Sequence, residues 1–214
     1  MFDLHTHSFF SDGVLGPAEL ARRCQVLGYR GLVISDHADH SNIESIVAGI
    51  AEFCAAVTGY YGEMELLPGC EITHVPPKLI KGAVRMAREA GAEVVLVHGE
   101  TIVEPVAPGT NRAAVEADCD VLAHPGLIAA EDVALAAEYG VLLEISGRKG
   151  HCLTNGHVAR LALEHGAPLS FGSDGHAPGD YPDRQRADAI LRGAGLSVEA
   201  AAQVMDNNRA VFGA

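Results

Sequence analysis

Seven short apolar segments recur along the chain, and a helix-like segment lies between each one and the next. No two of them are joined by a two-residue hairpin turn, so neighbouring strands are expected to pair in parallel, with helices as crossovers. Seven such units are enough to close or nearly close an α/β barrel, and an open doubly wound sheet is the alternative. The expected strands are residues 2–4, 31–35, 65–72, 93–97, 120–123, 141–145 and 169–173.

Local signals mark where the intervening helices begin and end. Pro17 occupies a first-turn position, and Gly28 is a stop signal for the same helix. From Ile43 onwards, apolar residues recur at i, i+3 and i+4, and Asn42 stands at the cap position. The expected helices are residues 17–27, 43–60, 76–91, 111–117, 131–139, 155–165, 184–192 and 198–207.

Composition favours one domain with an aliphatic core. It does not shift along the 214 residues in a way that suggests a boundary, so residues 1–214 are expected to form a single domain. Hydrophobic residues make up 48% of the chain, but aromatic residues only 5%, and tryptophan is absent. The core must therefore be built mainly from Ala, Val, Leu and Ile, which suits helices packed on a parallel sheet.

Charge, hydropathy and cysteine spacing argue against several classes of partner and against disulfide or zinc-knuckle sites. The formal net charge is −13 and no run of Lys and Arg interrupts it, which argues against nucleic acid and anionic membranes as partners. The chain has no apolar run of membrane-spanning length and no cationic leader, so a cytoplasmic protein is expected. Five widely spaced cysteines without a Cys-x-x-Cys pair predict reduced thiols rather than disulfides or a zinc knuckle. The oligomeric state stays open.

Side chains that can bind metal gather at the carboxyl ends of the expected strands, where barrels of this kind hold their active sites. His5 and His7 stand at i and i+2 on an extended segment, so both point to the same side. Asp12 follows in a loop that Gly13 allows to turn back. An apolar barrel mouth cannot leave many imidazoles and carboxylates unpaired, and metal ions supply the missing partner. The nine candidate metal ligands are His5, His7, Asp12, His37, Glu71, His98, His124, Asp174 and His176.

The order of these motifs is specific. Along the chain come His-x-His, Asp-Gly, a strand-final Asp-His, Gly-x-Glu, two strand-final histidines, one of them in His-Pro-Gly, and a final Asp-x-His. This order resembles that of the polymerase and histidinol phosphatase (PHP) family of metal-dependent phosphoesterases, and it covers almost the whole chain. The resemblance implies a distorted (β/α)7 barrel, with residues 1–214 as one PHP-like metallophosphoesterase domain.

The same resemblance implies two or three divalent ions. His5, His7, Glu71 and Asp174 would hold the first ion. Glu71, His98 and His124 would hold the second, which makes Glu71 a bridge between the two. Asp12, His37 and His176 would hold the third.

The residue types agree with this chemistry. Imidazole mixed with carboxylate suits Zn, Fe or Mn, whereas Mg and Ca prefer shells of oxygen. Clustered ions generate a bound hydroxide near neutral pH and stabilise the attacking and leaving oxygens of a phosphoester. No Ser-His-Asp arrangement or P-loop competes with this interpretation. Asp174 is the candidate catalytic residue, as acceptor of the proton from the nucleophilic water.

The expected substrate is a phosphate monoester, histidinol phosphate or a similar small phosphorylated metabolite. Arg148, Lys149, Arg184 and Arg186 are the basic residues expected to meet its phosphate. His151 and His157 are expected on the surface or behind the metal ligands. Two alternatives stay open, namely a phosphodiesterase or exonuclease acting on nucleotides or nucleic-acid ends, and a non-enzymatic metal-dependent regulatory domain.

Overall fold

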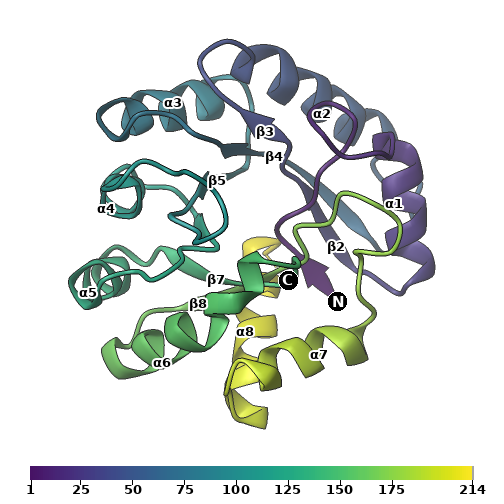
Figure 1. The fold of residues 1–214 in the computed structure, drawn as a ribbon. Helices are drawn as coiled ribbons and strands as arrows, with labels where there is room; N and C mark the ends of the chain where they lie inside the picture. The colour runs from purple at the N-terminus through teal and green to yellow at the C-terminus, as the bar shows by residue number, and fades with distance from the viewer. Residues whose placement is uncertain (214) are drawn as a thin grey trace.

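The computed structural model describes residues 1–213, which form a single α/β domain (Figure 1). Seven parallel strands make a nearly closed barrel flanked by helices, in the order β1-β2-β4-β5-β6-β7-β8. Strand order follows chain order without reversal, so the predicted barrel is confirmed and the doubly wound alternative is wrong. The strands are β1 (Phe2–Asp3), β2 (Gly31–Ile34), β4 (Glu65–Ile72), β5 (Val94–His98), β6 (Val121–Ala123), β7 (Leu142–Ser146) and β8 (Leu169–Gly172).

Every predicted helix is present, with shifted ends. The second predicted helix ends at Val57 rather than Tyr60, and the last one continues to Val211. None of the described helices is long and apolar enough to span a membrane. The helices are α1 (Pro17–Val26), α2 (Ile43–Val57), α3 (Pro77–Glu89), α4 (Thr110–Val115), α5 (Ala130–Tyr139), α6 (Asn155–His165), α7 (Arg184–Gly193) and α8 (Val198–Val211).

Two short elements were not predicted, and both lie at the mouth of the barrel. Strand β3 (His37–Ala38) pairs with the carboxyl end of β4, with His37 opposite Glu71. The 3-10 helix η1 (His151–Thr154) follows β7. Both are too short to produce a period in the sequence, so a pattern of apolar residues cannot reveal them.

The inward-facing residues form an apolar layer in the lower part of the barrel and a polar layer at the carboxyl ends of the strands. Leu67, Val94, Leu96 and Val121 belong to one buried cluster, which Phe212 joins from beyond α8. Because alternate residues of a strand face the same side, His98 stands one inward position beyond Leu96 at the end of β5. The apolar layer therefore forms a floor, and the ligand-type residues stand above it.

The barrel closes without regular pairing between β1 and β8. Near the mouth, the Asp174 N–H donates to His5 O at 2.9 Å. Near the floor, helix α8 packs against β8 and β1, and buried Asn208 connects them. Its Nδ2 donates to Phe2 O at 3.0 Å and to Phe171 O at 2.7 Å, while its Oδ1 accepts from Phe171 N at 3.0 Å. One amide side chain thus replaces a missing stretch of the β-ladder.

Replacing Asn208 with alanine is expected to destabilise the fold by roughly 2–4 kcal/mol. The change leaves up to three buried main-chain groups without a partner, and each such group costs about 1–3 kcal/mol, partly relieved by relaxation. The measurement is the urea midpoint of unfolding at unchanged m-value. Exposed Gln203 on the same helix is the control, since Gln203→Ala should move stability by less than about 0.5 kcal/mol. Equal stability of the two variants would show that the bridge contributes nothing.

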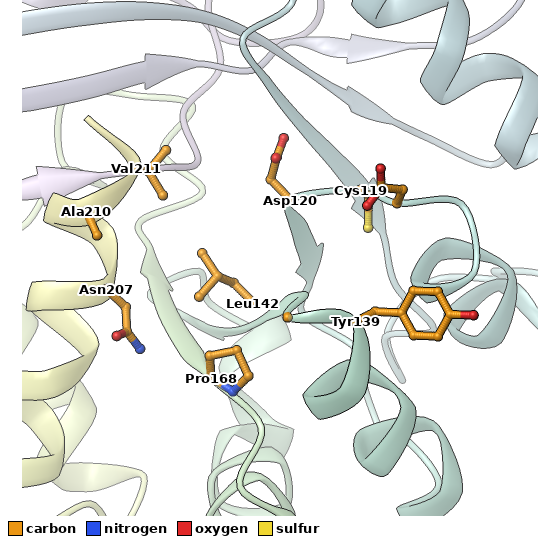
Figure 2. A pocket seen from close by; sticks show the side chains of 10 residues that line it. Cys119, Asp120, Tyr139, Leu142, Pro168, Asn207, Ala210 and Val211 are labelled. Atoms are coloured by element: carbon orange, nitrogen blue, oxygen red, sulfur yellow. The ribbon is translucent and has the colours of Figure 1, made fainter. Parts of the chain in front are cut away.

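A cavity of about 460 Å³ opens at the opposite end of the barrel from the histidines (Figure 2). Its walls come from the segments that precede β6, β7 and β8 and from α8, including Asp120, Leu142, Pro168 and Asn207. The Asp120 carboxylate is already bound by Arg88 Nη2 and by Val95 N, both at 2.6 Å. The described residues that line this cavity include no histidine, whereas the clustered histidines lie at the other end of the barrel.

Candidate metal centre

The structure brings the nine candidate ligands together at the carboxyl ends of the strands. Eight of them form overlapping groups whose ligand-type atoms lie within 4.8 Å of one another, and Asp174 lies against His7 and His124. His5 Nε2 is 3.4 Å from Glu71 Oε2, and His7 Nε2 is 3.3 Å from Asp174 Oδ1. His124 Nε2 is 3.3 Å from Glu71 Oε1. Residues from β4 and from the loops after β1, β6 and β8 thus meet at one point.

Glu71 stands at the centre of this group. The side chain is fully buried near the end of β4, and imidazoles of His5, His7, His37 and His124 surround its carboxylate. Although His37 Nδ1 lies 2.7 Å from Oε2, neither carboxylate oxygen receives a hydrogen bond from residues 1–213. A buried carboxylate with both oxygens unpaired is costly unless a cation binds it.

Asp12 approaches the cluster from a surface loop. His176 Nε2 is 3.1 Å from Asp12 Oδ1, and His37 Nε2 is 3.6 Å from the same oxygen. The loop is held by Asp36, whose carboxylate accepts hydrogen bonds from the backbone and hydroxyl groups of Ser8 and Ser11. The role of Asp36 in holding this loop was not predicted. From the sequence alone, an acidic residue beside His37 could equally be a metal ligand.

A buried carboxylate on β7 fixes the orientation of His5. Glu144 Oε2 is 2.6 Å from His5 Nδ1, which leaves His5 Nε2 facing Glu71. The approach needs Gly172, because a Cβ there would lie 2.5 Å from Glu144 Oε2 and 2.7 Å from His5 Cβ. Carboxylates commonly orient metal-binding imidazoles in this way. The sequence could have indicated a role for Glu144, because it is the single charged residue within the apolar segment 141–145.

Three residues beyond the predicted set surround His98. Glu104 Oε2 is 3.1 Å from His98 Nε2 and 3.4 Å from His74 Nε2. His151 is only 5% exposed, and its ring stacks on His124 with centroids 4.1 Å apart. His151 therefore lies behind the ligands and not on the surface.

Carboxylates raise the affinity of several imidazoles for protons. Against the effect of burial, the carboxylates of Glu144, Glu71 and Asp174 raise the pKa of His5 well above its usual 6.5. Burial is likewise outweighed at His37 and His98, whose pKa values are raised chiefly by Glu71.

The acids show the reciprocal shift. Burial alone would raise the pKa of Glu71, but the imidazoles of His5, His37 and His98 hold it well below the usual 4.5. Burial is also outweighed at Asp174, where the charges of nearby histidines lower the carboxyl pKa. By contrast, burial and the charge of His37 lower the pKa of His7 to about 3. The centre therefore holds ionised carboxylates that require positive charge among them.

Several buried atoms of the cluster have no hydrogen-bond partner within the described residues. This set includes both oxygens of Glu71, both ring nitrogens of His7, and Nε2 of His5. Imidazole nitrogens with carboxylate oxygens are the donor set of Zn, Fe or Mn sites. The residues present thus fit divalent transition-metal ions.

The four predicted substrate-binding residues separate into two groups. Arg148 reaches the cluster, with Nη1 2.8 Å from His176 Nδ1 and 3.2 Å from Asp174 O, and Lys149 beside it is exposed. Arg184 is exposed and lies near the amino terminus. Burial lowers the pKa of the Met1 amino group, and the charge of Arg184 adds to this effect. Exposed Arg186 donates from Nη1 to Gly179 O at 3.3 Å.

A family model for the PHP domain matches residues 3–176. Uncharacterized protein MJ1295 of Methanocaldococcus jannaschii is 44% identical over 197 residues, which cover 92% of this chain and 90% of that protein. DNA polymerase/3'-5' exonuclease PolX of Bacillus subtilis is 23% identical over 193 residues, which cover 81% of this chain but 34% of that protein. A 5'-3' exoribonuclease of Haemophilus influenzae is 39% identical over 72 residues, 34% of this chain and 23% of that protein.

Solved structures share the fold. A chain of archaeal ribonuclease P with mature tRNA superposes with a TM-score of 0.72 at 15% identity, over 97% of this chain and 89% of that one. A Listeria monocytogenes protein provisionally named histidinol phosphatase HisK superposes with a TM-score of 0.61 at 14% identity, over 85% of this chain and 97% of that one. At these identities the superpositions show a common architecture.

Proposed function

Since the chain belongs to the PHP domain family, which includes phosphoesterases and nucleases, we propose that it is a metal-dependent phosphatase. Its substrate would be a phosphate monoester, histidinol phosphate or a similar small phosphorylated metabolite. The single observation that carries the proposal is the buried Glu71 carboxylate, whose two unpaired oxygens face different histidines. That arrangement suits a carboxylate shared between two cations.

The residues divide naturally among the ions that they would hold. Oε2 of Glu71 faces His5, His7 and His37, and its Oε1 faces His124. A further group of His7, Asp12, His37 and His176 converges nearer to solvent. When bound, divalent ions would supply Lewis-acid stabilisation of the phosphoryl group and an activated water near neutral pH.

Asp174 is proposed as the proton acceptor. Its carboxylate is 3% exposed and lies 3.3 Å from His7 Nε2 and 3.7 Å from His124 Nε2. Its lowered pKa keeps the group ionised at neutral pH, so an unprotonated oxygen faces the centre. Arg148 would assist from the side, since its guanidinium already lies against Asp174 and His176.

Replacing Arg148 with methionine tests the substrate class. A charged hydrogen bond to phosphate contributes about 1.5–3 kcal/mol, so kcat/KM for a monoester should fall roughly 10- to 150-fold. Metal content is expected to stay constant, and hydrolysis of a diester should fall clearly less. Lys149→Met removes the same charge from the next, exposed residue and should change kcat/KM much less. An equal fall for monoester and diester would mean that the loop does not select monoesters.

The direct test of the proposed function combines metal analysis with a phosphate-release screen. Purified protein is assayed for Zn, Fe and Mn, and then for turnover of histidinol phosphate, nucleotides and a phosphodiester. Preferred release of phosphate from small monoesters is expected. Turnover of none of these compounds by the metal-loaded protein would favour the non-enzymatic regulatory role.

A nuclease is the second candidate, because two relatives are named as nucleases, PolX and the 5'-3' exoribonuclease. The two alignments cover only 34% and 23% of those proteins. The net charge of −13 weighs against an extended nucleic-acid footprint. Short nucleotides or nucleic-acid ends are therefore the form of this alternative that the screen must include.

A further inference from the structure

Glu104 lies at the edge of the centre, outside the set of ligands that the family resemblance assigns. It belongs to the loop between β5 and α4, and its side chain is 37% exposed. Three imidazoles converge on its carboxylate through their Nε2 atoms. His98 and His74 approach Oε2 at 3.1 and 3.4 Å, and His151 approaches Oε1 at 3.4 Å.

The orientation of His98 leaves a lone pair facing this carboxylate. His98 Nδ1 is 3.1 Å from Gly99 O, an atom that can only accept, so Nδ1 carries the ring proton. Nε2 is then the atom left for a metal ion, and it faces Glu104 Oε2 at 3.1 Å. An imidazole nitrogen and a carboxylate oxygen at this separation are a donor pair that one divalent transition-metal ion can bind.

Two spacings match those around one ion, and His98 belongs both to the group of Glu71, His98 and His124 and to the group of His74, His98 and Glu104. Ligand atoms around a tetrahedral ion with bonds of about 2.0–2.1 Å lie roughly 3.3 Å apart. The separation of His98 Nε2 and Glu104 Oε2 is 3.1 Å, and that of His124 Nε2 and Glu71 Oε1 is 3.3 Å. Glu71, His98 and His124 supply only three protein ligands, which leaves a position for another.

We propose that Glu104 is an additional carboxylate ligand of the ion held by Glu71, His98 and His124. This inference rests on the metal-dependent function proposed above. Because Glu71 would be shared with a neighbouring ion, a second carboxylate would offset more of the charge of the divalent ion at this position. Glu104 would approach the ion from the side that is open to solvent, whereas Glu71 approaches it from the floor.

The loop that carries Glu104 is fixed by its neighbours. Glu100 Oε1 accepts hydrogen bonds from Gly109 N at 3.0 Å and from Asn111 N at 2.9 Å, which tie the two ends of the loop together. Gly126 packs directly against this loop, since a Cβ there would lie 1.8 Å from Glu100 O. Glu104 is therefore presented by a braced loop and not by a free surface segment.

His151 and His74 would orient the carboxylate. His151 Nδ1 is 2.7 Å from Thr101 Oγ1, so the ring is anchored and its Nε2 is directed at Glu104 Oε1. Carboxylates that bind metal are commonly held by such outer partners. His74 is 45% exposed and approaches from the solvent side.

The test follows metal binding without any substrate. Metal-free wild type and Glu104→Gln are titrated with Co²⁺, whose visible spectrum reports the number and type of its ligands. Glu104→Gln is expected to weaken one class of site roughly tenfold to a hundredfold or more and to change the spectrum of that site, while the remaining sites fill normally. Glu116→Gln, an exposed acid after α4, removes the same charge and should behave as wild type.

The outcomes separate this inference from the proposed function. Glu104→Gln with wild-type affinity, stoichiometry and Co²⁺ spectrum would overturn the ligand assignment, even if its KM for a phosphoester rose. Weaker binding with an unchanged spectrum would overturn it as well, because that result describes a distant charge effect. Wild-type protein that binds no Co²⁺ would instead refute the metal-dependent function on which the inference rests.

Discussion

Glu71→Gln is expected to lose bound metal and turnover together, with kcat/KM lower by a factor on the order of a hundred or more. The substitution keeps the shape of the side chain but removes the charge that faces His5, His37 and His124. An amide cannot bind two cations through two anionic oxygens, so the spacing between the ions would no longer be fixed. Metal analysis and phosphate release on the same sample measure both effects.

Glu65→Gln is the matched control. Glu65 begins the same strand, β4, but its side chain is exposed at the opposite end. Its substitution should change neither metal content nor turnover. If Glu71→Gln kept its metal and turned over normally, the bridging role would have been assigned to the wrong residue.

The parts of the centre that follow strand ends were predictable from sequence. A buried strand of a parallel barrel ends at the mouth, so the residue that follows the apolar run must lie at the mouth as well. His98 and His124 illustrate this, since each directly follows three or more apolar residues. The fold was predictable for the same reason, because seven apolar runs and the helices between them define both the order and the direction of the strands.

Two residues carried to the centre by longer loops, Glu104 and His151, were not predicted as part of it. Glu104 stands six residues beyond the end of β5, and only the path of the loop brings it back to His98. His151 is similar, since η1 turns it inwards five residues after β7 ends. Arg184 illustrates the opposite case. It was predicted at the rim of the centre because it follows β8 in sequence, but it lies near the amino terminus. Loop paths depend on contacts between distant segments, which a local pattern does not contain.

Removal of the metal ions is expected to abolish hydrolysis and to lower the melting temperature. An ion at a hundred times its Kd stabilises the native state by about 2.7 kcal/mol, which corresponds to roughly 5–10 °C for each site in a chain of this length. The measurements are a thermal melt and a phosphate-release assay before chelation, after it, and after Zn²⁺ or Mn²⁺ is restored. A verified metal-free sample with full activity would contradict the metal-dependent mechanism.

The loss of stability on chelation should grow as pH rises through neutrality. In the metal-free protein, the raised pKa values of His5, His37 and His98 contribute stability that is complete below the unfolded value of 6.5 and is lost as pH rises through the folded values. His7, with its pKa lowered to about 3, opposes this trend but is a single residue. Metal binding changes in the other direction, because protons compete for these imidazoles until the pH passes their raised pKa values. The difference in melting temperature between loaded and chelated protein is therefore expected to be small at pH 5 and large at pH 8, and a difference that shrinks over this range would show that the ions do not bind through the histidines.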